Sequence, residues 1–356
     1  MSKKAAVLKK RSQKMLSNEE LSAFCGQMAM ILKAGISSVE GLGVLQEDAQ
    51  NDSERDLLGA MTDDMNETGT LWHALDGTGV FPAYVLRMTK IGEETGTLDD
   101  VMSTLSTYYE RQESISSSIR SSLTYPLIMA GMMLLIIIVL ITKVMPVFNQ
   151  VFTQLGQEMT GLSLGILNTG MVLSKYAYVF VALALLVLVL LIYLTKTDSG
   201  RVHLRNIAYH FSGPRSLYDK MAACRFAGGL SLSLKSGMTP EYGLEMSKEL
   251  VDDPHFLKKV ANCDQLFKTD ASLAEALGKS KIFTGVYAKM AAIADRTGTM
   301  DEVLDQIASQ YTEDVDDGVN SFIAVLEPTL VIILAVIVGI ILLSVMLPLL
   351  GIMSGL

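Results

Sequence analysis

The sequence is poor in the residues that build reactive and metal-binding sites. Of its 356 residues, three are cysteine and four are histidine, and none of them stands at CxxC or another metal-ligand spacing. No Ser/His/Asp or Cys/His constellation is present, and no lysine-containing phosphate loop. These absences predict a chain that is not an enzyme and that needs no cofactor. The three cysteines are expected to be reduced and buried: Cys25, Cys224 and Cys263.

Charged side chains are missing from three long apolar stretches, which lie between Arg120 and Lys143, at 176–195 and at 328–356. The mean hydropathy of +0.36 is also high for a water-soluble protein. At about 1.5 Å of rise per residue, each stretch can cross a hydrocarbon layer of about 30 Å. No segment shows the alternation of a β-strand. The sequence therefore predicts an all-α membrane protein with transmembrane helices at 125–147, 176–195 and 328–350.

Lysine and arginine are absent from residues 149–174, although 29 occur in the chain. Positively charged flanks stay on the cytoplasmic side of a membrane. We therefore expect a multi-pass protein of the cytoplasmic membrane with its amino terminus inside and its carboxyl terminus outside. The cytoplasmic parts would be a basic tail at 1–16 and helical domains at 17–124 and 196–327, and the external parts a connection at 148–175 and the terminus at 351–356.

The overall charge also limits the partners. A net charge of −9 argues against a nucleic-acid partner. The six basic residues of the tail at 1–16 fit either a solvated arm or contact with anionic lipids of the bilayer.

What the chain does contain is a duplication. Thr95-Gly96-Thr97-Leu98-Asp99 returns as Thr297-Gly298-Thr299-Met300-Asp301, 202 residues later. The same interval, without a gap, relates further pairs over more than 120 residues. Each copy ends in an apolar span, so an unpaired span is needed to return the chain to the side of the first domain. The pairs include Phe24 with Phe226, Gly35 with Gly237, Tyr109 with Tyr311, Pro126 with Pro328 and Pro146 with Pro348.

The repeated Thr-Gly-Thr segment predicts a corner between two helices. Gly96 can end one helix in the left-handed conformation and Thr97 can begin the next, with Asp99 in its first turn. Gly298, Thr299 and Asp301 repeat this arrangement. A nucleotide site is excluded, because neither the lysine nor the preceding strand of a phosphate loop is present. Gly35 and Gly237 predict an earlier corner in each copy.

Four acidic residues lie shortly before the third apolar stretch. Glu313, Asp316 and Asp317 would share one face of a helix, with Asp314 beside them. Such a cluster is either a solvated face or a surface for a basic partner protein. The candidate partner-contact residues are therefore Gly96, Thr97, Asp99, Gly298, Thr299, Asp301, Glu313, Asp316 and Asp317.

The chain resembles the type II secretion F family. The resemblance rests on the duplication and on three motifs: Gly-Glu-x-Thr-Gly-x-Leu-Asp at 92–99, Tyr125-Pro126, and Pro146-Val147-Phe148 followed by Phe152 and Gly156. The resemblance extends from about Glu19 to Leu350. It implies a non-catalytic inner-membrane platform of type IV pili, type II secretion systems or competence pseudopili.

That resemblance also implies the partners. They would be a cytoplasmic assembly ATPase, pilin or pseudopilin subunits, other inner-membrane assembly proteins, further copies of the chain and the lipid bilayer. Calcium binding in some relatives makes Glu40, Glu93 and Asp99 weak candidate ligands, although their spacing does not define the six or more oxygens that calcium takes.

The alternative reading is an oligomeric transporter or permease subunit. Transport sites are usually built from ionisable groups or broken helices near the middle of the membrane, and these spans offer only the marginal Lys143 and Glu327. Gly131, Gly339 and Ser344 would allow close packing of helices in either case.

Overall fold

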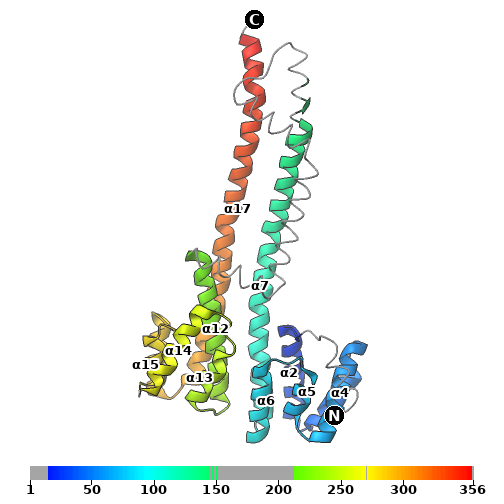
Figure 1. The fold of residues 1–356 in the computed structure, drawn as a ribbon, viewed down its shortest axis with the longest axis vertical. Coiled ribbons are helices and arrows are strands. Elements are labelled where there is room, and N and C mark those ends of the chain that lie inside the picture. The colour runs from blue at the N-terminus through cyan, green and yellow to red at the C-terminus, as the bar shows by residue number, and fades with distance from the viewer. Residues whose placement is uncertain (1–14, 145, 148–149, 151–211, 270, 355–356) are drawn as a thin grey trace. The chain divides into compact units, whose positions relative to one another are not determined.

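A computed structural model describes residues 15–144, 146–147, 150, 212–269 and 271–354, and within these ranges every regular element is helical (Figure 1). The predicted all-α class is confirmed. With the labels of Figure 1, the helices of the first repeat are α2 (Asn18–Lys33), α3 (Ser38–Asp48), α4 (Asp52–Thr68), α5 (Leu71–Thr78), α6 (Ala83–Thr95), α7 (Leu98–Val139) and the π-helix η1 (Leu140–Val144). Those of the second repeat are α12 (Ser212–Lys235), α13 (Pro240–Lys248), α14 (Pro254–Lys268), α15 (Leu273–Lys279), α16 (Val286–Thr297) and α17 (Met300–Ser354).

The two repeats have the same helices in the same order, with α2 to α7 matching α12 to α17. Individual contacts recur as well. The Ser22 hydroxyl donates to the carbonyl of Ser106, and the Cys224 thiol, 202 residues later, donates to the carbonyl of Ala308. The duplication read from the sequence is therefore also a duplication of packing.

Helix ends follow the local chemistry of the chain. Gly35 and Gly237 adopt φ of 79° and 75°, each two residues after the last residue of its helix, α2 or α12, and so form the predicted corners. Ser17 closes a capping box with Glu20. Thr239 is the N-cap of α13 and precedes Pro240, but its side chain makes no capping hydrogen bond.

The buried core of the first repeat takes residues from each of its six α-helices, and it continues into the second repeat. Leu232 of α12 and Met246 of α13 belong to the same buried cluster as Leu21, Tyr84 and Leu105. The chain up to Ser118 and from Leu217 to Asp316 forms one compact unit. The helical domains, predicted as two bundles, thus share part of their packing.

α7 and α17 are much longer than the predicted spans. They contain 42 and 55 residues, about 63 Å and 82 Å at 1.5 Å per residue. Pro126 and Pro328, near the first residues of two predicted spans, both lie inside these helices, as does Pro348. Each proline removes one backbone hydrogen bond, yet the remaining backbone of an apolar segment still favours an unbroken helix.

The apolar halves of α7 and α17 expose their side chains. Leu127, Met132 and Leu135 on α7, and Ile332 and Leu343 on α17, are each more than half exposed. Two described helices are long and apolar enough to cross a membrane. Because so many large apolar groups face outward, water is an unfavourable surrounding and lipid a favourable one. The predicted span at 176–195 and the connection at 148–175 lie outside the described residues.

A π-helical turn, η1, follows α7 and contains Lys143. It lies in the apolar part of the first repeat, where Lys143 is the first charged residue after Arg120. π-Turns inside helices are rare and change the direction in which the following side chains point.

Candidate functional site

The two Thr-Gly-Thr segments form matching corners between consecutive helices. Gly96 ends α6 with φ 74° and ψ 21°, and Gly298 ends α16 with φ 74° and ψ 16°. In each corner the next backbone N–H reaches back into the preceding helix: Thr97 donates to the carbonyl of Gly92 and Thr299 to that of Ala294. The predicted corners are confirmed.

In each corner, the two threonine hydroxyls on either side of the glycine form a hydrogen bond with each other. The hydroxyl of Thr95 lies 2.8 Å from that of Thr97, and in the second repeat Thr297 lies 2.7 Å from Thr299. A Cβ added to either central glycine would meet no atom within 4 Å. Both corners are therefore open at the surface, which makes them accessible to a partner.

The acidic residues after the corners lie in the first turns of α7 and α17. Asp99 and Asp301 are half-buried, and the backbone carbonyl of Asp301 accepts a hydrogen bond from Ser231. A carboxylate there is favoured by the positive end of the helix. Asp99 and Asp301 therefore stabilise the first turns of α7 and α17, and both remain partly exposed beside the corners.

The acidic cluster on α17 is divided in the structure. Asp314 turns toward its own repeat, where Tyr287 donates a hydrogen bond of 3.0 Å to it and Lys220 lies 3.5 Å away. Glu313 and Asp317 are exposed, whereas Asp316 is half-buried with Oδ1 buried and unpaired. Burial and Asp314 together raise the pKa of Tyr287 to about 12. Only Glu313 and Asp317 present an open acidic surface.

The weak calcium candidates have other partners. Glu40 closes the capping box of Ser37 at the start of α3. Glu93 accepts hydrogen bonds from the backbone N–H groups of Leu71 and Trp72, and so caps α5 from the neighbouring α6. Across the described ranges, no three His, Cys, Asp or Glu side chains gather at metal-binding distance. The structure does not bring Glu40, Glu93 and Asp99 together as a ligand set.

Sequence reasoning missed the contacts by which the first repeat packs on the second. The hydroxyl of Tyr84 on α6 donates a hydrogen bond of 3.1 Å to the carbonyl of Gly229 on α12. One turn further along α6, Arg87 forms an ion pair of 2.9 Å with Glu249 at the end of α13 and lies 3.9 Å from the sulfur of Met246. The interval of 202 residues could not reveal these contacts, because they join positions that are not equivalent.

A second cross-repeat contact is centred on Asp305 of α17. Arg111 of α7 lies 2.9 Å from one of its carboxylate oxygens and Lys235 of α12 lies 3.0 Å from the other. Burial alone would raise the pKa of Asp305, but the hydrogen bonds and positive charges of Arg111 and Lys235 outweigh it and hold that pKa below its ordinary value. The carboxylate therefore stays charged at neutral pH and ties α7 to α12.

The three cysteines are buried and free, as predicted. Burial raises the pKa of the Cys25 thiol to about 12 and that of Cys263 to about 11. A thiol is a nucleophile or a metal ligand only as the thiolate. At neutral pH these cysteines thus act as small apolar core residues.

The chain matches the family model described as type II secretion system (T2SS), protein F, over residues 24–146 and again over 226–348. The two matched segments are offset by the repeat interval. The chain is 26% identical over 339 residues to the type IV pilus assembly protein PilC of Thermus thermophilus, covering 95% of this chain and 84% of the relative. It is 25% identical to PilC of Myxococcus xanthus, covering 94% and 80%, and 23% identical to the type II secretion system protein F of Aeromonas hydrophila, covering 94% and 86%.

Proposed function

The chain belongs to the type II secretion system protein F family, and from this premise we propose that it is a non-catalytic platform protein of the inner membrane in a type IV pilus or type II secretion-like machine. The names of its relatives support this proposal, since they denote type IV pilus assembly proteins and a secretion system component. The described residues support it too, because they offer exposed corners at Gly96 and Gly298 as contact surfaces.

The proposed platform crosses the membrane three times, at 125–147, 176–195 and 328–350. The domains at 17–124 and 196–327 lie in the cytoplasm together with the basic tail at 1–16, and the connection at 148–175 and the residues at 351–356 lie outside. The absence of lysine and arginine from residues 149–174 supports this orientation.

The observation that carries the proposal is the continuity of α7 and α17. Each helix begins directly after an exposed glycine corner, at Leu98 or Met300, and runs without a break into its apolar half. A helix transmits displacement along its axis better than a jointed chain, because its backbone hydrogen bonds resist bending. A partner that moves either corner would therefore move the same helix within the membrane.

We assign the partner at the corners to a cytoplasmic assembly ATPase. In this proposal its cycle shifts the helical domains, and α7 and α17 pass the movement to pilin or pseudopilin subunits and to other assembly proteins in the bilayer. This role needs no catalytic group in the chain itself. The proposed coupling is mechanical, and the functional sites of the chain are surfaces that contact other proteins.

Site-specific crosslinking in cells tests the coupling. A photoreactive residue placed at Thr97 or Thr299 should capture the ATPase, and the repeat-equivalent exposed positions Asp56 on α4 and Lys258 on α14 are the matched controls. The proposal requires severalfold more ATPase adduct at the corners than at the controls, at equal expression. Equal yields of the ATPase adduct at all four positions would show that the corners do not contact the ATPase.

Cysteine labelling tests the orientation separately. A cysteine introduced at 160 should react with a membrane-impermeant maleimide in spheroplasts, whereas cysteines at 56 and 258 should react only after the membrane is opened. Labelling of residue 258 in intact spheroplasts would overturn the three-span arrangement while leaving family membership untouched.

A further inference from the structure

Where α6 packs on α12 and α13, the two repeats contact each other through unlike surfaces. The first repeat contributes the α6 face, formed by Tyr84 and Arg87. The second contributes the α12–α13 surface, which includes Leu232, Met246 and Glu249. A contact between unlike surfaces is heterologous, so each repeat retains a copy of the surface that its neighbour used.

The interval of 202 residues locates these remaining copies. The counterparts of Tyr84 and Arg87 are Val286 and Lys289 on α16, which we call the α16 face. The counterparts of Leu232, Met246 and Glu249 are Met30, Val44 and Glu47 on α2 and α3, which we call the α2–α3 groove.

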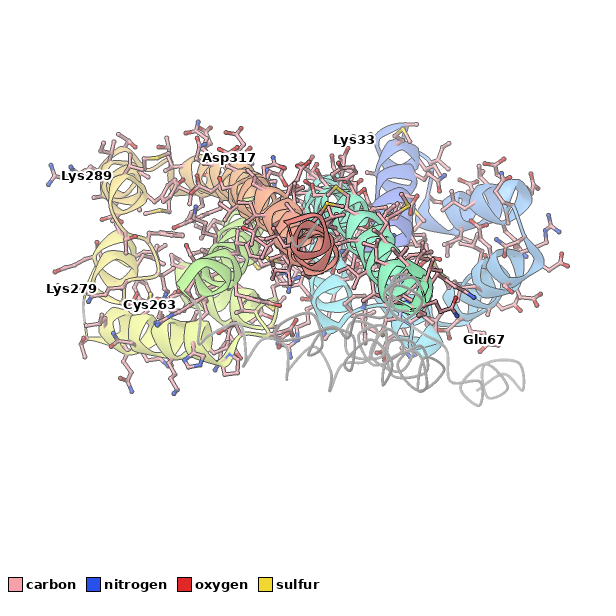
Figure 2. All side chains as sticks on the ribbon, turned by 90° about the horizontal axis from the view of Figure 1, so that it is seen from above. Lys33, Glu67, Cys263, Lys279, Lys289 and Asp317 are labelled. Carbon is pink, nitrogen blue, oxygen red and sulfur yellow. The ribbon has the colours of Figure 1, made fainter. Side chains whose placement is uncertain are left out.

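Both copies are uncovered. Tyr84 is 2% exposed, whereas Val286 is 61% exposed. Leu232 and Met246 are 1% and 0% exposed, whereas Met30 and Val44 are 67% and 50% exposed. The side chain of Lys289 lies at the outer edge of the second repeat (Figure 2).

The α2–α3 positions also form a concave surface. An open groove there is lined by residues that include Gln27, Met30, Val44, Glu47 and Asp48. Four of them, Gln27, Met30, Val44 and Glu47, are the counterparts of residues named in the internal contact. Apolar groups gathered in an exposed concavity, with acids at its rim, are typical of a protein-binding surface.

The charges of the internal contact are preserved in its uncovered copies. Arg87 pairs with Glu249 inside the chain, and the corresponding residues are Lys289 and Glu47, again a cation and an acid. In the part of the chain that the structure describes, neither Lys289 nor Glu47 has an ion-pair partner. Each is therefore available to the other from a different molecule.

One hydrogen bond of the internal contact has no counterpart between copies. Within the chain, the hydroxyl of Tyr84 donates to the backbone carbonyl of Gly229. The counterparts of these two residues are Val286 and Gln27, and valine has no hydroxyl to donate.

We propose that a second copy of this chain occupies the α2–α3 groove with its α16 face, repeating between molecules the contact that α6 makes with α12 and α13 within one. The α16 face of the first copy then stays open for a third. Such a head-to-tail contact builds a closed ring if its rotation closes, and an open chain of molecules if it does not.

Not every internal contact is repeated, and this keeps the two kinds of contact distinct. Arg111 and Asp305 attract each other inside the chain, whereas their counterparts Glu313 and Ser103 form no ion pair. The contact between copies therefore lacks one attraction that holds the repeats of a single chain together. We expect it to be the weaker and more reversible of the two.

Crosslinking between two differently tagged full-length copies tests this proposal. One copy carries Val44→Cys and the other Lys289→Cys, since Arg87 lies 3.9 Å from the sulfur of Met246 in the internal contact. A short bismaleimide should join the two copies severalfold more often than it joins Val44→Cys to the control Lys258→Cys on α14. The native cysteines are buried, and wild-type copies give the background.

The pattern of products separates the proposed contact from other modes of association. Val44→Cys alone should give only background dimers, and a chain carrying both substitutions should give a ladder beyond the dimer. Strong dimers of Val44→Cys alone, or yields equal to those with Lys258→Cys, would overturn the head-to-tail contact. Neither result would bear on the coupling to an ATPase, which is measured at the corners.

Charge reversal gives an independent measurement of the same contact. Glu47→Lys should reduce the crosslinking yield, with self-association about tenfold weaker, and Lys289→Glu should do the same. Both reversals together should restore it, because the pair is then re-formed with its signs exchanged. If the double reversal is no better than either single reversal, Lys289 does not meet Glu47.

Discussion

The hydroxyl of Tyr125 donates a hydrogen bond of 3.3 Å to Oε1 of Glu327, and the two residues occupy the same position in the two repeats. Each directly precedes the first proline of its long helix, Pro126 or Pro328. α7 and α17 thus meet at equivalent levels where their apolar halves begin. The duplication has produced two helices in register as well as two similar domains.

This register predicts a crosslink within one chain. In a chain that carries both Tyr125→Cys and Glu327→Cys, a short bismaleimide should join the two cysteines. If a protease site is inserted between residues 156 and 200, the two fragments released by cleavage should then remain covalently joined. Thr124→Cys combined with Glu327→Cys is the matched control, since residue 124 points about 100° away around α7. A control yield as high as that of the Tyr125 pair would contradict the register.

The charge of Asp305 makes the stability of the packed repeats depend on pH. A carboxyl group whose pKa is lowered by folding stabilises the folded chain above its unfolded pKa, near 3.8, and loses this effect as the pH falls through the lower, folded value. We expect Asp305→Asn to cost about 1 kcal/mol at pH 7 and clearly less at pH 3. Denaturant unfolding in detergent, followed by the fluorescence of Trp72, the single tryptophan, measures this difference.

The repeat supplies a control for this prediction. Ser103 is the counterpart of Asp305 and accepts a hydrogen bond of 3.2 Å from Lys33, the counterpart of Lys235. Because serine does not titrate, Ser103→Ala should have the same small effect at both pH values. A pH-independent effect of Asp305→Asn would show that its charge is not what joins α7 to α12.

The left-handed conformation of Gly96 predicts a cost for any side chain there. Gly96→Ala should reduce the free energy of unfolding by about 1 kcal/mol, because an L-residue is strained at φ 74°. Gly43→Ala in the interior of α3 should instead raise it by about 0.5 kcal/mol. An added Cβ meets no atom within 4 Å at either glycine, so the backbone conformation alone separates the two. Equal effects in denaturant unfolding would refute this account of the corner.

Lys281 is the one described residue other than glycine with a positive φ, at 58°, and its counterpart in the first repeat is Gly79, at 68°. The second repeat thus keeps a turn that suits glycine although the residue has changed. Lys281→Gly should raise the free energy of unfolding by about 0.5–1 kcal/mol, and Gly79→Lys should lower it by about 1–2 kcal/mol. Circular dichroism during denaturation measures both, and changes of the same sign would contradict the shared turn.

The sequence was sufficient to predict the features that depend on local chemistry. Gly96 and Gly298 end helices because glycine tolerates their φ, and the interval between them gives the order of the helices in both repeats. It was insufficient around Pro126, because the apolar stretch predicted a transmembrane helix from residue 125, whereas the helix that contains it begins at Leu98. In the folded chain the surrounding helix continues through Pro126 despite the lost hydrogen bond.

Contacts between distant segments were beyond sequence reasoning for a different reason. Tyr84 and Val286 occupy the same position in the two repeats, yet one is buried against the second repeat and the other is exposed. Equivalent positions acquire different neighbours when two copies pack head to tail. Periodicity describes what the repeats share, and it cannot describe an asymmetric contact between them.

The cap that Glu93 places on α5 distinguishes the two corners. Glu93 lies one turn before Gly96 and anchors that end of α6 to the start of α5, where Thr70 provides no side-chain cap. In the second repeat, Ser272 caps α15 by itself, and Asp295, the counterpart of Glu93, is exposed. The two equivalent corners are thus held by different neighbours, the first through Glu93 to the start of α5 and the second through the hydrogen bond from Ser231 of α12 to the carbonyl of Asp301.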